Sequence, residues 1–146
     1  MNFEEIVRGL PSIGKCYRDG LSGVKGEHRS KLQTENPRHW KGSADLEKCY
    51  FQSRGEASFD YLIGHGREGY FVEIHPASTS EVNTLVLKKE SIERWLKEEA
   101  SSLKKILAYQ PYVWLSTNKV AILKNSPQAK RLAKSGIRFP QSVIRL

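Results

Sequence analysis

The stretch that decides the fold runs through residues 58–75, with the sequence SFDYLIGHGREGYFVEIH. Residues 58–63 and 70–75 are rich in aromatic and β-branched side chains, which favour strands. The six residues between them contain three glycines and indicate a turn. Pro76 ends the second strand, because proline has no N–H to donate to a neighbouring strand. These features predict a β-hairpin.

The length of the turn sets the register of this hairpin. If Ile63 faces Tyr70 across the six residues, Asp60 lies opposite Glu73. Directly opposed Cβ atoms in an antiparallel pair are about 4.5–5.5 Å apart. His75 points to the same face as Glu73, because side chains alternate along a strand. The hairpin therefore predicts two carboxyl groups and an imidazole at its open end, and a slip of one residue would separate them.

Two opposed carboxylates repel each other unless a cation lies between them. Mg²⁺ is typically held by one or two carboxylates together with phosphate oxygens and waters, and it activates water and stabilises charge on a phosphoryl group. We therefore predict Asp60 and Glu73 as ligands of Mg²⁺ or Mn²⁺. Three roles are open for His75: a metal ligand, a general base, or a structural histidine at the strand end.

A long amphipathic helix is predicted after the hairpin. Ser78 and Glu81 have the spacing of a capping box, and apolar residues follow at helical spacing over residues 80–108. Lys89 falls near the centre of the apolar stripe, whereas Lys88 lies off it. Two interpretations of Lys89 are open. Its stem extends along the apolar surface to solvent, or its ammonium reaches a polar site beneath the helix.

The order of elements along the chain predicts an α/β (α+β) fold with a mixed central sheet flanked by helices. One domain is expected over residues 1–146, with an N-terminal helix and basic loop region at 1–43 and a core at 44–146. The further expected elements are helices over residues 3–10 and 44–49, an irregular loop over 12–42, a second hairpin over 112–116 and 119–123, a helix from Ser126 to Gly136, and a strand over 143–146.

The chain is strongly basic, with 24 Lys and Arg against 16 Asp and Glu and a formal net charge of +8. Such an excess attracts polyanions, and we expect DNA or RNA as the partner. Trp40 is interpreted either as a platform on which bases stack or as a buried anchor of its loop. The predicted nucleic-acid contacts are Arg38, Trp40, Lys41, Lys130, Arg131 and Lys134.

The sequence predicts a cytoplasmic protein without a membrane segment. No apolar run approaches the roughly 18–20 residues that cross a bilayer, and the first residues carry two acids and no signal-peptide core. Cys16 and Cys49 are too few for a disulfide framework or a zinc site, so free thiols are predicted. A homodimer is compatible with the sequence, but no residue pattern marks a dimer face.

The order of these residues resembles the PD-(D/E)XK, or restriction-endonuclease-like, nuclease superfamily. In that superfamily an Asp lies on one strand, an Asp or Glu followed by x-Lys lies on the next, and a helix packs behind them. The resemblance covers roughly residues 44–116 and implies metal ligation by Asp60 and Glu73. Phe59 stands where the superfamily has a proline, and His75 occupies the position of the lysine.

Some superfamily members carry the lysine on the following helix, and the resemblance gives that role to Lys89. There it would orient the attacking water or stabilise the phosphate, with His75 replacing or assisting it. Glu47, or Asp45, would add a further acidic group from the preceding helix. The implied activity is that of a metal-dependent phosphodiesterase acting on nucleic acid. Two other classes stay open: a non-catalytic nucleic-acid-binding module on the same fold, and a protein-interaction component whose charge serves an acidic partner.

Overall fold

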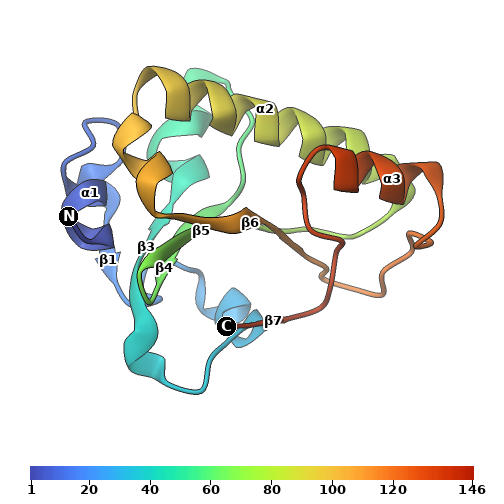
Figure 1. Ribbon diagram of the computed structural model, residues 1–146, viewed down its shortest axis with the longest axis horizontal. Coiled ribbons are helices and arrows are strands. Elements are labelled where there is room, and N and C mark those ends of the chain that lie inside the picture. The colour runs from blue at the N-terminus through green and yellow to red at the C-terminus, as the bar shows by residue number, and fades with distance from the viewer.

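The computed structural model describes residues 1–146. Five strands form a sheet in the order β1-β3-β4-β5-β6 (Figure 1). Neighbours from β1 to β5 are antiparallel, whereas β5 and β6 are parallel, so the sheet is mixed and the α+β prediction is confirmed. The strands are β1 (Arg18–Asp19), β3 (Trp40–Asp45), β4 (Tyr61–His65), β5 (Glu68–Ile74) and β6 (Leu107–Leu115).

The β4–β5 hairpin has the predicted register. Ile63 pairs with Tyr70, and Tyr61 pairs with Val72. The turn closes through Gly66, whose φ of 62° lies in the left-handed region that glycine adopts without strain. This register decides the position of every side chain on the hairpin, because it fixes which face each one enters.

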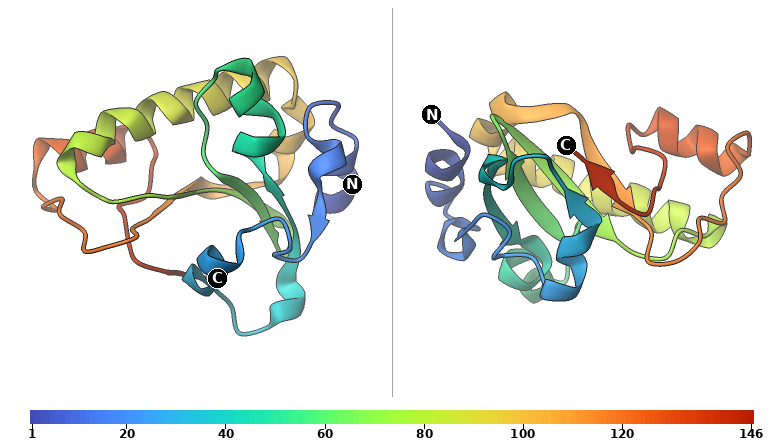
Figure 2. Two further views of the ribbon diagram at one scale, coloured as in Figure 1. Left: turned by 180° about the vertical axis from the view of Figure 1, so that it is seen from behind. Right: turned by 90° about the horizontal axis from the view of Figure 1, so that it is seen from below.

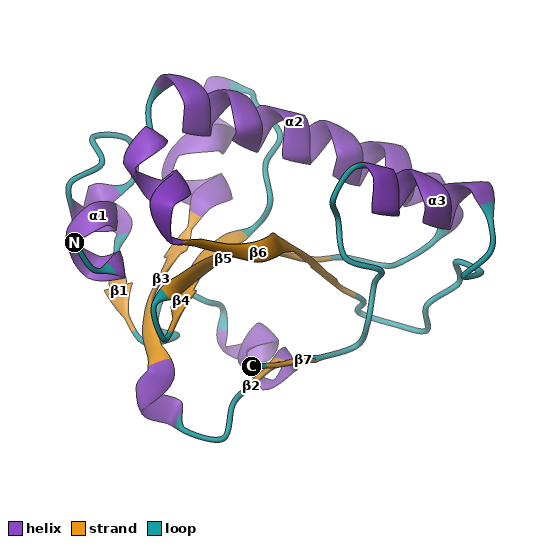
Figure 3. Cartoon of the chain, in the orientation of Figure 1, coloured by secondary structure: helices purple, strands orange, loops and turns teal.

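The two faces of the sheet are covered differently. Helices α1, α2 and α3 pack on the face that carries Leu62, Phe71 and Trp114, and α2 runs along this face (Figures 1 and 3). The opposite face, with Ile63 and Val72, is covered by N-terminal segments and by a small parallel sheet of β2 and β7 (Figure 2). The covering elements are α1 (Phe3–Arg8), α2 (Val82–Glu98), α3 (Pro127–Lys134), β2 (Leu32–Gln33) and β7 (Ile144–Arg145).

Helix α2 begins two residues later and ends earlier than the sequence predicts. A 3-10 helix over Ser101–Ile106 separates it from β6. The predicted capping box is wrong, because the Ser78 hydroxyl bonds the Ser80 hydroxyl and Glu81 contacts His75 instead. None of the helices combines the length and the apolar character that crossing a membrane requires.

Two further element predictions are wrong. Residues 112–116 do not form a hairpin with 119–123, because β6 pairs in parallel with β5 and Ala121 donates its N–H to the carbonyl of Ala77. The inner strand β3 occupies residues that were expected in the loop and at the start of the helix predicted over 44–49. The helical segment begins later, as a π-helix over Glu47–Phe51. The polar sequence of β3 hid its strand character, since only its pairing on both sides stabilises it.

Several terminal elements agree with the sequence. Helix α1 is present, and the side chain of Ser126 caps α3 by accepting from the N–H of Ala129 at 3.2 Å. Gly136 follows α3 with a left-handed φ of 76°. The last predicted strand is present as β7, paired with β2.

Cys16 and Cys49 form a disulfide, so the prediction of free thiols is wrong. Their separation of 33 residues gave no sign of proximity, but the fold brings their Cα atoms to 6.2 Å. This distance lies within the range that a disulfide spans. The bond ties the N-terminal segment to the π-helix that carries Glu47.

Candidate active site

Asp60 and Glu73 lie opposite each other at the open end of the hairpin, as predicted. The N–H of Asp60 donates to Oε1 of Glu73 at 3.1 Å, and the N–H of Ile74 donates to Oδ2 of Asp60 at 3.0 Å. Each carboxyl group is therefore bonded to the backbone of the other strand. Glu73 is only 1% exposed, and Asp60 is partly buried. The second oxygen of Asp60, Oδ1, takes no part in these bonds.

The lysine at this site is Lys88 and not Lys89. The ammonium of Lys88 forms an ion pair with Oε2 of Glu73 beneath α2. Lys89 points elsewhere: its ammonium lies 5.2 Å from the ring centre of Tyr112 and 3.5 Å from Oε1 of Glu93. The prediction that Lys89 supports the acids is therefore wrong.

The buried side of α2 is wider than the predicted stripe. That stripe had Lys89 near its centre, but Trp95, which lies off the centre, is also buried, with 3% exposure. Its indole N–H donates to the hydroxyl of Ser12 at 3.0 Å, so a contact distant in sequence draws this side of the helix inward. Lys88 precedes Trp95 by seven residues and therefore shares its side of α2. Both lysines therefore border buried positions of α2, and the spacing of its apolar residues does not by itself identify Lys88.

The site holds more negative charge than Lys88 neutralises. Burial raises the pKa of Glu73 to about 8, the charge of Asp60 contributes to this rise, and Lys88 opposes it. Burial also raises the pKa of Asp60, against the bond from Ile74 and the charge of Lys88, while the charge of Glu47 adds to the rise. Without additional positive charge, the coupled pair therefore retains a proton near neutral pH.

His75 lies between two carboxylates. Its Nε2 is 2.9 Å from Oε2 of Glu81, and its Nδ1 is 4.0 Å from Oε2 of Glu73. The backbone carbonyl of His75 accepts from the indole N–H of Trp114 at 3.1 Å, which fixes the strand end. Both ring nitrogens thus face acids of this chain. Of the three roles left open, this geometry best fits a structural histidine at the strand end.

A cleft of about 250 Å³ opens beside Asp60. Glu47 and Asp45, the further acidic candidates, both line it. The carboxylate of Asp45 accepts from the N–H of Lys48 at 3.0 Å and so caps the π-helix, which leaves Glu47 as the freer acid. The residues lining the cleft are Lys25, His28, Asp45, Glu47, Lys48, Gln52, Asp60 and Tyr61.

The donor atoms at this end of the hairpin suit a hard divalent cation. No group of three or more His, Cys, Asp or Glu side chains is arranged to hold a metal ion by itself. Mg²⁺, however, is usually held by one or two carboxylates and completes its shell with water and phosphate oxygens. Burial raises the pKa of Asp60 and of Glu73, and a bound cation would favour their ionised forms. The residues present therefore fit Mg²⁺ or Mn²⁺ held by Asp60 and Glu73, with Glu47 nearby.

The predicted nucleic-acid contacts fall into two groups on separate elements. Arg38 and Lys41 are exposed beside the start of β3, where Trp40 is half-buried with its ring 4.9 Å from that of His65. The indole therefore partly anchors its loop and partly faces solvent. The second group is exposed on α3 and consists of Lys130, Arg131 and Lys134.

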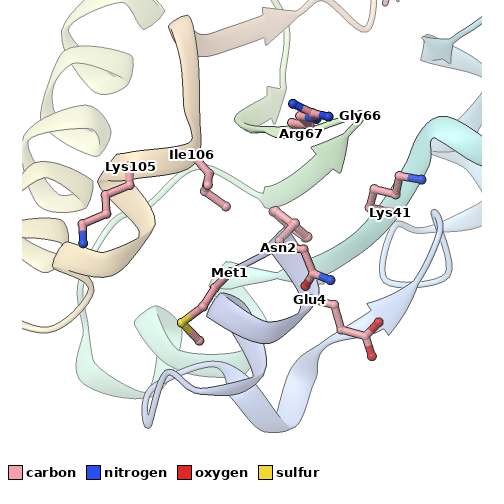
Figure 4. Close-up of a pocket in the computed structure, with 9 residues that line it drawn as sticks. Met1, Asn2, Glu4, Lys41, Gly66, Arg67, Lys105 and Ile106 are labelled. Carbon is pink, nitrogen blue, oxygen red and sulfur yellow. The ribbon is translucent and has the colours of Figure 1, made fainter.

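A larger pocket, of about 690 Å³, lies at the turn of the hairpin (Figure 4). Lys41 lines it together with Arg67 and Lys105, two cations that were absent from the predicted contacts. Glu4 is its only acid, and no carboxyl pair is present there. Its positive charge suits contact with phosphates. It has no pair of carboxyl groups that could hold a metal ion for phosphodiester cleavage.

Comparisons with protein families, with curated proteins and with solved structures found no match to this chain.

Proposed function

We propose that this protein is a metal-dependent phosphodiesterase that acts on nucleic acid, with its active site at Asp60, Glu73 and Lys88. One observation carries the proposal: two carboxyl groups from adjacent strands are held against each other, largely buried, with a single lysine. Burying a charged group costs several kcal/mol, so such pairs are typical of functional sites. A purely structural pair would be better matched in charge.

The order of elements supports a place in the PD-(D/E)XK superfamily. Strands β4 and β5 are followed by α2 and then by β6, which matches the strand–strand–helix–strand order that the resemblance implies. In this proposal Lys88 of α2 takes the place of the superfamily lysine. His75, which occupies the usual lysine position, is positioned by Glu81.

Each residue has a role that follows from its surroundings. Asp60 and Glu73 would hold Mg²⁺ or Mn²⁺, which supplies Lewis-acid stabilisation of phosphoryl oxygens and acidifies a bound water. Lys88 lowers the pKa of Glu73 against the effect of burial, and it would place a positive charge near the phosphate as that group gains negative charge. The N–H of Asp60 and the ammonium of Lys88 hold the Glu73 carboxylate in its orientation, while His75 is held by Glu81 at the strand end.

A non-catalytic nucleic-acid-binding module is the second candidate. The net charge of +8 and the basic pocket at the turn of the hairpin favour it. Phosphate contacts by exposed cations supply sequence-independent affinity without any chemistry. In this case the metal would affect neither binding nor the nucleic acid.

Cleavage assays on labelled single- and double-stranded DNA and RNA, with Mg²⁺ or Mn²⁺, test the proposal. We expect the wild type to cut with either metal and to lose activity in EDTA. Glu73→Gln should reduce the rate at least about 100-fold, since catalytic electrostatic groups typically contribute that much. Glu68→Gln is a matched control, because Glu68 lies at the other end of the same strand and is exposed.

Two results would argue against the enzyme. Equal activity of Glu73→Gln and the wild type would place any cleavage elsewhere. A folded wild type that binds nucleic acid but cuts nothing with either metal would favour the binding module.

A further inference from the structure

The cleft beside Asp60 is lined by residues of both charges. Its acids are Asp45, Glu47 and Asp60. Its nitrogen donors are Lys25, His28 and Lys48, and no prediction from the sequence included Lys25 or His28. A phosphodiester that reacts with help from a metal needs both charges, because the metal binds to acids while the unreacting phosphate oxygens need donors.

A chain of hydrogen bonds orients His28 within this cleft. The N–H of Lys25 donates to the hydroxyl of Tyr61 at 3.4 Å, and that hydroxyl lies 2.7 Å from Nδ1 of His28. Burial raises the pKa of Tyr61 to about 12, so its hydroxyl keeps its proton. Because the hydroxyl accepts from Lys25, its own proton is directed to Nδ1. The neutral imidazole then carries its proton on Nε2.

The Nε2 atom of His28 has no hydrogen-bond acceptor within the protein. Its nearest acid is Glu27, with Oε1 at 4.0 Å, which is beyond hydrogen-bonding distance. The side chain of His28 is 20% exposed and lines the cleft that also contains Asp60. An oriented donor is therefore available at the opening of the candidate active site.

We propose that this cleft binds one phosphate group of the nucleic-acid strand, with donors from His28 Nε2 and the ammonium groups of Lys25 and Lys48. The inference rests on the proposed function, because it concerns the substrate of the same site. It assigns His28 as a positioning residue for the phosphate. A cation on Asp60 and Glu73 would strengthen this binding, because the carboxylates that line the cleft otherwise repel a phosphate.

The size of the cleft indicates which part of the substrate enters it. At about 250 Å³ it lies below the roughly 300–1,000 Å³ of typical small-molecule pockets. It therefore receives a phosphate and its adjoining sugar and excludes a base pair. Donors that contact only phosphate carry no base preference, so we expect binding without sequence specificity.

Nuclear magnetic resonance of the ¹⁵N-labelled histidine rings, with inorganic phosphate as the probe, tests this inference. Inorganic phosphate cannot be cleaved, so the measurement does not depend on enzyme activity. In the free protein we expect the His28 ring to show a proton on Nε2 and an acceptor at Nδ1. Added phosphate should shift the Nε2–H signal of His28, and Mg²⁺ should tighten the binding.

Two variants give the matched comparison. His28→Gln should weaken phosphate binding roughly 10- to 100-fold, as expected for a hydrogen bond to a charged group. His39→Gln, which changes an exposed histidine outside the cleft, should leave it unchanged. With an oligonucleotide substrate, His28→Gln should raise KM and leave kcat within a few-fold.

The two proposals fail in different ways. Phosphate that leaves the His28 signals unmoved, or that binds equally to wild type and His28→Gln, would overturn the phosphate site. In a second outcome, phosphate binding needs His28, but Glu73→Gln shows the same Mg²⁺ dependence as the wild type. That outcome would support the phosphate site and contradict the metal site.

Discussion

The two ends of the β4–β5 hairpin carry charge in opposite ways. At the open end, Asp60 and Glu73 are bonded to each other's strands and lie beneath α2 with Lys88. At the turn, Arg67 is exposed, and together with Lys41 it lines a pocket with no carboxyl pair. The same hairpin therefore joins a buried acidic site to an open basic surface.

This difference shows which charges carry information about function. An exposed cation retains its hydration and contributes little to folding, so many proteins tolerate such residues without a role. A buried carboxyl pair destabilises the fold unless it is compensated, and Lys88 compensates only one of the two acids. The open end therefore supports a claim about chemistry, whereas the turn supports only a claim about electrostatic attraction.

The largest expected effect is on the stability of the open end. Lys88→Met should lower the free energy of unfolding by about 3–5 kcal/mol at pH 7 without divalent metal, because the negative charge that remains on the buried carboxyl pair then has no cation beside it. Lys89→Met, the neighbouring change, should cost less than about 1 kcal/mol, since Lys89 pairs only with the exposed Glu93. Urea unfolding of both variants measures the difference. Equal losses would mean that the two lysines have similar surroundings.

The disulfide braces the same end of the molecule. It closes a loop of 33 residues in sequence separation, for which chain-entropy arguments give about 3–4 kcal/mol. The double change Cys16→Ser with Cys49→Ser should lower the free energy of unfolding by about that amount. Reduction of the wild type should lower its melting temperature, and the double variant should show no response to reductant. A wild type that is equally stable with and without reductant would show that the bond contributes nothing.

The buried acids also give the open end a characteristic pH dependence. The pKa of Glu73 is raised to about 8, so the folded state keeps a proton that the unfolded state releases above its ordinary value near 4.5. By linkage, this group makes the protein lose stability as the pH rises from about 4.5 through 8. The expected loss is on the order of several kcal/mol, because each pKa unit between 4.5 and about 8 corresponds to about 1.4 kcal/mol.

Melting temperatures of the wild type and Glu73→Gln at pH 5.5, 7 and 8.5, without divalent metal, measure this dependence. The wild type should lose stability toward pH 8.5 relative to Glu73→Gln, whose side chain does not titrate. A difference between the two proteins that stays constant across this range would contradict the raised pKa of Glu73.

The smallest expected effect on stability lies at the turn of the hairpin. The triple change of Lys41, Arg67 and Lys105 to Gln should alter the free energy of unfolding by less than about 0.5 kcal/mol per residue. It should nevertheless weaken nucleic-acid binding and reduce the dependence of log affinity on log salt by about 0.7–0.9 for each phosphate that the variant no longer neutralises. Fluorescence titrations at several salt concentrations measure the slope. An unchanged slope would remove the turn from the binding surface.

The sequence was sufficient where a structural feature depends on neighbouring residues. The pairing of Ile63 with Tyr70 brings Asp60 to Glu73 as predicted, although the strands extend to His65 and Glu68, so that the turn has two residues and not six. The cap at Ser126 and the left-handed Gly136 also follow from local rules. These interactions act over a few residues, and side-chain chemistry alone determines them.

The sequence was insufficient where the deciding interaction is between distant residues. Lys88 shares a side of α2 with Trp95, which is buried against Ser12, 83 residues away in sequence, and it pairs with Glu73 on a different element. Cys16 and Cys49 meet only after the N-terminal segment has folded against the π-helix. His28 reaches the cleft through the hydroxyl of Tyr61, 33 residues further along the chain. No local pattern marks these three interactions.

Calorimetric titration of Mn²⁺, performed in two buffers that differ in ionisation enthalpy, tests the central claim most directly. If Asp60 and Glu73 form a metal site, the wild type should bind Mn²⁺ at pH 7 and release about one proton, because the pKa of Glu73 near 8 falls when the metal binds. Glu73→Gln should lose both the binding and the proton release, and Glu68→Gln should keep them. No binding by the wild type, or the same binding by Glu73→Gln, would contradict the metal site at the open end of the hairpin.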